Sequence, residues 1–179
     1  MTKQRTVLVT GGSRGIGASI AKHFAEQGDR IAVHYSSNGD LAAEVMASLP
    51  GSGHMTAQAD LRDADAIKIM VDAVAKEFGH IDILINNAGV FFDHPIETSS
   101  YEVWQKAWAD TLGVNLTGAA NVSWCALQHM PRHGDSRIVN VGSRGAFRGE
   151  PVSPAYGASK AAIVAFGQSI AKALAPEGI

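Results

Sequence analysis

The 179-residue sequence contains one cysteine, Cys125, so no disulfide can form within the chain. Such scarcity is typical of proteins in a reducing compartment. Long apolar runs are also lacking: none approaches the ~20 residues of a membrane-spanning helix, and the apolar run before Gly11 is too short for a signal peptide. We therefore expect a cytoplasmic protein that is not inserted in a membrane.

An excess of charge of one sign is missing as well. The chain has 15 Lys+Arg and 17 Asp+Glu, a net charge of -2, which offers no electrostatic basis for binding nucleic acid or an anionic membrane. Repeats and linker-like stretches are absent from the sequence, so its length favours one domain over residues 1–179. His129 and His133 are four apart, but Pro131 separates them and no third ligand follows, so no metal site is expected.

Apolar, β-branched runs alternate with helical patterns along the chain. Expected strands cover residues 6–9, 30–35, 54–59, 81–85 and 137–141, and helical patterns cover 18–27, 41–49, 64–78 and 99–130. Runs of this kind are typical of buried strands in a parallel sheet. The sequence therefore predicts an open α/β sheet, in which ligands bind outside the carboxyl ends of the strands.

A glycine-rich turn, residues 10–17, follows the first expected strand and precedes a helix. Glycines let a phosphate approach the backbone, and the free N–H groups and dipole of the helix favour negative charge. The spacing Gly11-x3-Gly15-x-Gly17 differs from the commonest dinucleotide fingerprint and lacks the Gly-Lys-Ser/Thr of a P-loop. In this setting the turn still predicts a site for a dinucleotide phosphate.

The end of the second expected strand favours NADP(H) over NAD(H). An NAD site has an acid there to bond the ribose 2′-OH, but this strand ends in residues 34–38, His-Tyr-Ser-Ser-Asn. The first acid, Asp40, is expected to cap the following helix. Arg14 opposes the dipole in the first turn of its helix, a placement that an adjacent 2′-phosphate explains; a solvated arginine is the alternative.

Polar residues follow the next three expected strands. Asp60 could accept a hydrogen bond from an adenine amino group, or it could be a simple turn residue. Residues 86–89, Asn-Asn-Ala-Gly, fit a tight turn whose exposed amides would suit a ribose. Ser143 comes just after the fifth strand. Because ligands bind at the carboxyl ends of such strands, these signals converge on one edge of the sheet.

Tyr156 and Lys160 are four residues apart at the start of an Ala-rich helical pattern. That spacing puts them on one face of a helix, about 5–6 Å apart at Cβ. Tyrosine is a poor acid or base at neutral pH, but a nearby ammonium favours the phenolate, and Ser143 could hold the oxygen whose proton Tyr156 handles. Asn115, a poor helix former inside residues 99–130, indicates either a solvent-facing residue or a kink with a polar role.

As a set, these residues resemble the signature of the short-chain dehydrogenase/reductase family, over essentially the whole chain. The motifs are Thr10-Gly11-x3-Gly15-x-Gly17, Asp60, Asn86-Asn87-Ala88-Gly89, Asn115, Ser143 and Tyr156-x3-Lys160. Residues 10–17 with Tyr35-Ser36 most resemble the 3-oxoacyl-[acyl-carrier-protein] reductase branch. The resemblance implies a Rossmann-like, doubly wound parallel sheet in three α/β/α layers, and NADP(H)-dependent hydride transfer between a carbonyl and a secondary alcohol.

The resemblance also implies roles for individual residues. Tyr156 would be the general acid/base, Ser143 would hold the substrate oxygen, Lys160 would bind the nicotinamide ribose and favour the phenolate, and Asn115 would support a water in a proton relay. The implied cofactor contacts are Gly11, Ser13, Arg14, Gly15, Ile16, Gly17, Tyr35, Ser36, Asp60, Leu61, Asn87, Ala88, Gly89, Tyr156 and Lys160.

Family members normally continue past Ile179 into two further strands and a substrate lid. The fifth strand would then be an unpaired edge, so we expect either a chain that is C-terminally truncated relative to the family or a partner that covers this edge. For the isolated chain we expect weak or absent turnover. This leaves open a non-catalytic sensor or scaffold that binds NADP(H). Another nucleotide-dependent enzyme, such as a methyltransferase, would leave Ser143, Tyr156 and Lys160 unexplained.

Small residues line the Ala-rich helix after Tyr156 and allow another helix to approach closely. We expect a homodimer or homotetramer built on this helix and on residues 112–130. The alternative is a monomer in which alanine serves helix propensity. The expected partner is a small-molecule carbonyl or alcohol substrate, whose identity the sequence leaves open.

Overall fold

The computed structural model describes residues 4–132 and 134–179. Its strands are β1 (Thr6–Val9), β2 (Arg30–Tyr35), β3 (Met55–Gln58), β4 (Ile83–Asn86) and β5 (Arg137–Asn140). They form one sheet in the order β3-β2-β1-β4-β5, and every pairing is parallel. Because the chain crosses from the β3 edge back to β4, the sheet is doubly wound, and the expected Rossmann-like fold is confirmed.

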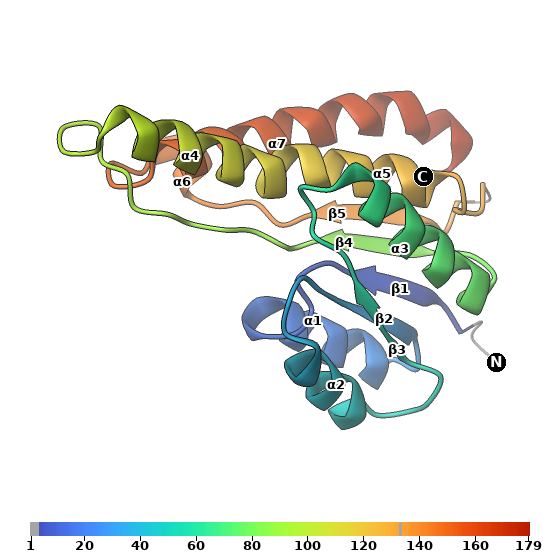
Figure 1. Ribbon diagram of the computed structural model, residues 1–179. Coiled ribbons are helices and arrows are strands. Elements are labelled where there is room, and N and C mark those ends of the chain that lie inside the picture. The colour runs from blue at the N-terminus through green and yellow to red at the C-terminus, as the bar shows by residue number, and fades with distance from the viewer. Residues whose placement is uncertain (1–3, 133) are drawn as a thin grey trace.

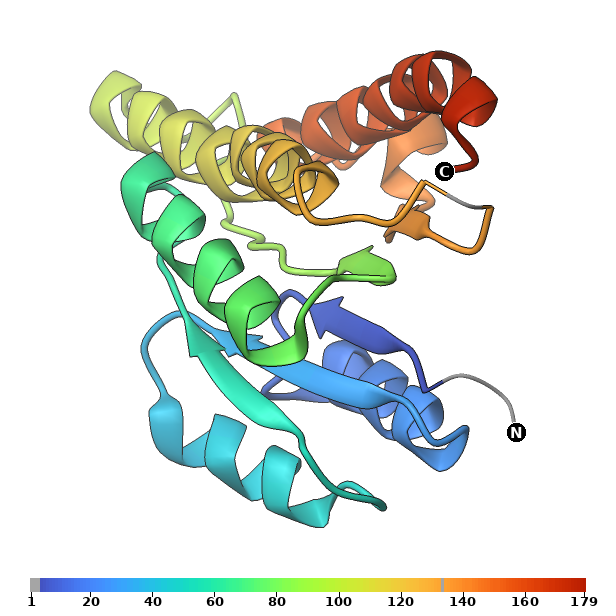
Figure 2. The same ribbon diagram turned by 90° about the vertical axis from the view of Figure 1, so that its right-hand side faces the viewer.

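Helices cover both faces of this sheet (Figures 1 and 2). α1 (Gly15–Glu26) and α2 (Gly39–Ser48) lie on one face, and α3 (Ala64–Phe78), α4 (Tyr101–Leu112), α5 (Ala119–Leu127) and α7 (Pro154–Leu174) lie on the other. The short α6 (Gly145–Arg148) precedes α7, and a 3-10 turn, η2 (Ala175–Glu177), follows it. The molecule therefore has the three α/β/α layers that the sequence predicts.

The central strands are buried on both faces because successive side chains point to opposite sides. In β1, Val7 and Val9 pack with α1 and α2, whereas Leu8 packs with α3 and α5. Each of these three side chains is fully buried. This continuous apolar run fixes the strand in the core, and it brings the carboxyl ends of β1 and its neighbours to one edge.

Side chains cap the N-termini of α2, α3 and α4. Asp63 caps α3 as expected, accepting hydrogen bonds from the next turn, and Gly79 ends it with φ 86°. The expectation that Asp40 caps α2 is wrong: the Asn38 side chain accepts the hydrogen bond from Leu41 N at 3.1 Å, and Asp40 lies in the first turn. Asn38 has the extended backbone of a cap residue, which makes it the better acceptor.

The long helical pattern of residues 99–130 is interrupted by one wide π-helical turn, η1 (Gly113–Gly118), between α4 and α5. Asn115 lies in this turn and is 2% exposed, so the solvent-facing alternative is wrong and a buried polar role is left. π-helical turns occur at functional sites more often than elsewhere, and this one contributes to the site below.

Membrane spans, metal clusters and the single cysteine were also considered in the sequence. Within residues 4–132 and 134–179, no helix is long and apolar enough to cross a membrane, and no group of three or more His, Cys, Asp or Glu side chains could hold a metal ion. His133 lies outside the described residues. Cys125 is buried, and burial raises the pKa of its thiol, which fits a structural rather than a reactive cysteine.

Candidate cofactor and catalytic site

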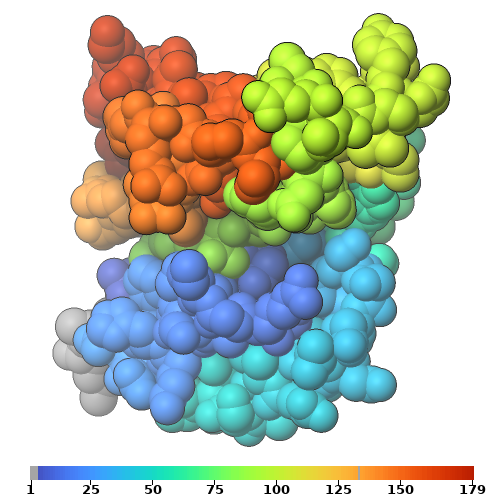
Figure 3. Space-filling model, turned by 90° about the vertical axis from the view of Figure 1, so that its left-hand side faces the viewer, coloured from blue at the N-terminus to red at the C-terminus, as the bar shows by residue number. Residues whose placement is uncertain are grey.

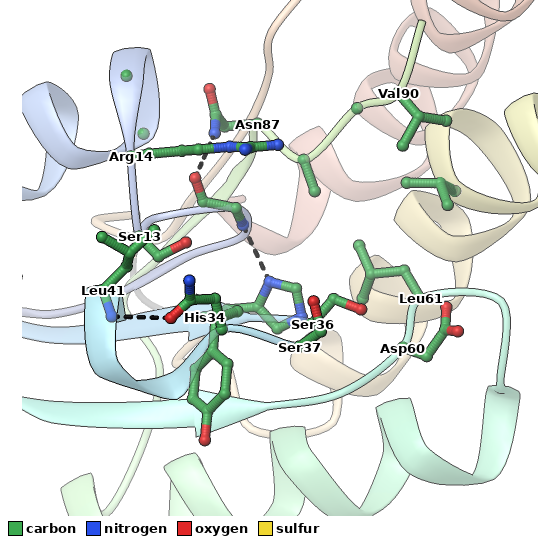
Figure 4. Close-up of a pocket in the computed structure, with 18 of the residues that line it drawn as sticks. Ser13, Arg14, His34, Ser36, Ser37, Leu41, Asp60, Leu61, Asn87 and Val90 are labelled. Carbon is green, nitrogen blue, oxygen red and sulfur yellow. Dashed lines mark hydrogen bonds between the residues drawn. The ribbon is translucent and has the colours of Figure 1, made fainter. Parts of the chain in front are cut away.

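A cavity of about 670 Å³ opens along the carboxyl ends of β1 to β4. Figure 4 shows around it Arg14, which precedes α1, His34 on β2, and Asp60, which follows β3. Its lining includes all the expected cofactor contacts except Tyr156 and Lys160, namely Gly11, Ser13, Arg14, Gly15, Ile16, Gly17, Tyr35, Ser36, Asp60, Leu61, Asn87, Ala88 and Gly89. The fold thus brings these residues into one concave surface.

The glycine turn requires glycine at two positions for different reasons. Gly11 has φ 63°, a left-handed conformation that disfavours side chains. At Gly17 a Cβ atom would lie 2.1 Å from the Gly11 carbonyl oxygen and 2.5 Å from Asn87 Nδ2. The N-terminus of α1 therefore packs directly on the turn, which leaves the face of the turn toward the cavity open to a ligand.

Asn87 braces this turn. Its side-chain amide donates hydrogen bonds to the carbonyl oxygens of Thr10 (2.9 Å) and Gly11 (3.1 Å). The backbone N–H groups of Asn87 and Ala88 donate to the Thr10 hydroxyl at 3.0 and 3.1 Å. The amides of Asn87 and Ala88, two of those expected to suit a ribose, are therefore engaged within the protein, and they join the ends of β1 and β4.

His34, on β2, supports the glycine turn, a role that the sequence interpretation missed. Its Nδ1 accepts a hydrogen bond from Gly11 N at 2.9 Å, so the ring proton is on Nε2, which donates to the Ala59 carbonyl at 3.1 Å. The side chain is 2% exposed, and burial lowers its pKa to about 4. Along β2, His34 alternates with Ile31 and Val33, so its side chain points to the other face of the sheet. This alternation was the signal in the sequence that could have identified it as buried.

The charged side chains at the cavity differ in whether they form ion pairs. Arg14 is exposed at the start of α1, extends over the cavity (Figure 4), and makes no ion pair within residues 4–132 and 134–179. Arg62, which the sequence interpretation also missed, binds Asp60 at 2.6 Å and Asp110 at 3.0 Å. Hydrogen bonds from Arg62 hold the pKa of the Asp60 carboxyl below its usual range. Arg14 lines the same cavity as Ser36 and Ser37, where its positive charge would favour an anion.

Tyr156 and Lys160 lie in the first two turns of α7 and on the same side, as their spacing predicts. Lys160 Nζ is 5.8 Å from the centre of the Tyr156 ring, and it donates a hydrogen bond to the Val141 carbonyl at 2.8 Å. The Lys160 side chain is buried, which lowers its pKa. The Phe91 ring packs against the Tyr156 ring at 4.9 Å. An ammonium is thus fixed beside a phenol in a partly apolar setting.

Asn115 connects this pair to the chain after β4. Its Oδ1 accepts from Val90 N at 2.8 Å, and its Nδ2 donates to the Val90 carbonyl at 3.0 Å and to the Ser159 hydroxyl at 3.1 Å. Built at Gly89, a Cβ would be 3.4 Å from Asn115 Oδ1 and 3.7 Å from Lys160 Nζ. Because Gly89 also lines the cavity, it is where the cavity adjoins the catalytic candidates.

Ser143 follows β5 and begins the turn into α6. Its hydroxyl accepts a hydrogen bond from Gly145 N at 3.1 Å, and its side chain is partly exposed. The lining of the cavity does not include Ser143. Figure 3 shows this part of the chain, in orange, above the hollow that separates it from the blue glycine turn and α1.

The chain resembles known proteins over its full length. The family model for short chain dehydrogenase matches residues 5–179. The 3-oxoacyl-[acyl-carrier-protein] reductase FabG of Staphylococcus aureus is 35% identical over 181 aligned residues, which cover 100% of this chain and 72% of that protein. The probable galactose dehydrogenase GalD of Rhizobium meliloti is 35% identical over 179 residues, covering 99% and 68%.

Solved structures show the same likeness. A short chain dehydrogenase from Burkholderia cenocepacia, determined in complex with NADP, matches with a TM-score of 0.86 and 37% identity, over 98% of this chain and 70% of that chain. A dehydrogenase/reductase from Sinorhizobium meliloti matches with a TM-score of 0.85 and 33% identity, over 98% and 68%. These TM-scores show that the backbone, as well as the sequence, is similar.

Proposed function

Because this chain belongs to the short chain dehydrogenase family, oxidoreductases that act on CH–OH groups, we propose that it interconverts a carbonyl and a secondary alcohol with NADP(H). Tyr156 is the proposed general acid/base. The observation that carries this proposal is the fixed Lys160–Tyr156 pair, 5.8 Å from Nζ to ring centre, adjoining at Gly89 a cavity that holds the expected nucleotide contacts. We also propose that residues 1–179 form one NAD(P)-binding domain.

The cavity fits NADP(H) better than NAD(H). Arg14 provides a cation without an ion-pair partner in the described ranges, and it lines the same cavity as Ser36 and Ser37. A guanidinium and two hydroxyls suit a 2′-phosphate. No acid follows β2 before Asp40 to bond a free ribose 2′-OH. The related Burkholderia cenocepacia enzyme was solved with NADP, which supports the same choice here.

In the proposed reaction NADP(H), held by the residues that line the cavity, would supply or accept the hydride, and the protein would orient the substrate and move the proton. Tyr156 donates its phenolic proton to the carbonyl oxygen in reduction, and takes it back in oxidation. The Lys160 ammonium stabilises the phenolate and is itself held by the Val141 carbonyl. Ser143 would hold the substrate oxygen, and Asn115 would support a water in a proton relay.

The experiment combines cofactor binding with turnover. NADPH is titrated into the purified chain, and its oxidation is followed with 3-oxoacyl thioesters, aldoses, steroids and quinones. For any substrate found, Tyr156→Phe should lower kcat by about 100-fold or more, the usual scale of general acid–base catalysis, and change the NADPH Kd by less than about twofold. Tyr101→Phe, at an exposed tyrosine on α4, is the matched control. Unchanged kcat in Tyr156→Phe would rule out the proposed role.

A second candidate is a sensor or scaffold that binds NADP(H) without turnover. It is favoured by one observation: the cavity lining includes the nucleotide contacts but neither Tyr156 nor Lys160. NADPH binding without oxidation of any substrate in the screen, and unchanged in Tyr156→Phe, would support this candidate over the first.

We further propose a homodimer or homotetramer formed through α5 and α7. Trp124 on α5 is 61% exposed, a large apolar side chain of the kind found at interfaces. Analytical ultracentrifugation should show an assembly larger than a monomer, and Trp124→Arg should shift it toward monomer. A monomeric wild-type chain at about 50 µM, where a contact of micromolar Kd would be largely formed, would contradict the proposal.

A further inference from the structure

His94 is fully buried in the segment between β4 and α4, and its ring has hydrogen-bond partners on both nitrogens. Nε2 lies 3.1 Å from Ala155 N, and Nδ1 lies 2.7 Å from the Phe92 carbonyl. A backbone N–H can only donate, so Nε2 is the acceptor and the proton lies on Nδ1, which donates to Phe92. The geometry thus defines a neutral ring and a single tautomer.

The bond to Ala155 replaces a helix cap. The first N–H groups of a helix lack partners within it, and the residue before the helix usually supplies an acceptor. Ser153 is that residue in α7, but it makes no capping hydrogen bond, and its buried hydroxyl has no hydrogen-bond partner within residues 4–132 and 134–179. The imidazole of His94, 61 residues earlier in the chain, serves instead.

His94 contacts two segments that flank Tyr156, the start of α7 and the segment that contains Phe91. Ala155 is the residue before Tyr156, and the Phe92 carbonyl belongs to the segment in which Phe91 packs on the Tyr156 ring at 4.9 Å. His94 N also donates to the Val152 carbonyl at 2.7 Å. The yellow-green segment before α4 and the orange segment before α7 accordingly lie against each other in Figure 3.

We propose that His94 is a positioning residue for Tyr156: it caps α7 from a distant segment and sets the position of the phenol between the helix and Phe91. Trp104 closes the remaining side, with its ring 5.5 Å from the imidazole in an edge-on arrangement. This inference rests on the proposed role of Tyr156, and it adds a residue that the family signature in the sequence does not contain.

Two variants separate hydrogen bonding from packing. His94→Phe keeps a planar ring beside Trp104 but has no acceptor for Ala155 N. His94→Gln places an amide oxygen near the Nε2 position and so retains the cap. Three properties are measured: kcat and KM at saturating NADPH, the NADPH Kd, and the hydrogen-exchange rate of the Ala155 amide. The control is His23→Phe, the same substitution at an exposed site on α1.

We expect His94→Phe to lower kcat by about tenfold or more, since misplacing a catalytic group by about 1 Å has effects of that order or larger. KM and the NADPH Kd should change by less than about threefold, and Ala155 exchange should accelerate. His94→Gln should recover most of kcat and of the protection. A His94→Phe protein that is folded, with kcat within twofold of wild type, would overturn the positioning role even if its thermal stability fell.

Two further outcomes remain decisive. If the wild-type chain binds NADPH but reduces no substrate, the proposed function fails, and Ala155 exchange then decides the cap alone: equal protection in wild type and His94→Phe overturns it. If His94→Phe does not fold, His94→Asn replaces it, because its shorter amide reaches Phe92 but not Ala155. Equal kcat in the Asn and Gln variants would contradict the inference.

Discussion

Arg14 is the single side chain that we propose to determine the choice between the two nicotinamide cofactors. A charge-assisted hydrogen bond to a phosphate contributes about 1.5–3 kcal/mol. Arg14→Ala should therefore weaken NADPH binding by roughly 10–100-fold and leave NADH binding unchanged, as measured by calorimetric titration. Lys22→Ala removes an exposed cation from the same helix, outside the cavity lining, and should alter neither. Equal losses for both cofactors in Arg14→Ala would contradict a 2′-phosphate contact.

His34 links the stability of the cofactor site to pH. Burial lowers its pKa from 6.5 to about 4, so between these values the unfolded chain binds the proton more readily than the folded one. Its contribution is complete above about pH 6.5 and is lost as the pH falls toward 4. The shift corresponds to about 3 kcal/mol at most. Urea unfolding at several pH values should show this decline.

The matched variant is His34→Asn, whose side-chain oxygen can still accept the Gly11 N–H but does not titrate in this range. Between pH 6.5 and 4 its free energy of unfolding should decline less than that of wild type, because all other titrating groups are shared. Parallel curves for the two proteins would show that His34 is not the source of the pH dependence.

At the scale of elements, the π-helical turn η1 places the side-chain amide of Asn115 so that it connects α7 with the loop after β4. In Asn115→Leu, a substitution of similar shape, Val90 N–H, the Val90 carbonyl and the Ser159 hydroxyl lose a partner. Leaving such groups unpaired should lower the free energy of unfolding by about 2–4 kcal/mol, measured by urea denaturation. Thr117→Ala, at an exposed residue of the same turn, should change it by less than about 0.5 kcal/mol.

The elements also show which features a sequence can predict. The strands, the glycine turn and the Tyr156–Lys160 face follow from local periodicity and spacing, and the structure confirms them. His34 and His94 were not recognised, because their partners are 23 and 61 residues away and only the folded chain brings them together. The cap of α2 was assigned to the wrong residue because Asn38 and Asp40 are both good acceptors, and the backbone conformation decides between them.

At the scale of the whole molecule, two apolar cores lie on opposite faces of one sheet. Leu8 and Leu84 belong to the core under α3 and α5, and Val7 and Ile85 belong to the core under α1 and α2. Alternate residues of the same strands build both cores, so neither can be lost without the other. We therefore predict a single cooperative unfolding transition, the all-or-none behaviour that single domains commonly show.

Two probes test this cooperativity. The three tryptophans, Trp104, Trp108 and Trp124, all lie on α4 and α5, so their fluorescence reports on one face, whereas far-ultraviolet circular dichroism reports on all helices. The two transitions in urea should coincide. A fluorescence midpoint clearly separated from the circular dichroism midpoint would indicate two independently unfolding units.

The contact at Gly17 has a practical meaning for protein engineering. Since even a methyl group there would collide with the Gly11 carbonyl oxygen, libraries that diversify Gly11, Gly17 or the bracing Asn87 would consist mainly of misfolded proteins. Arg14, Ser36 and Ser37 are exposed at the rim of the cavity, so substitutions there would disturb the packing of the protein least. Redesign of coenzyme preference should begin at those three codons.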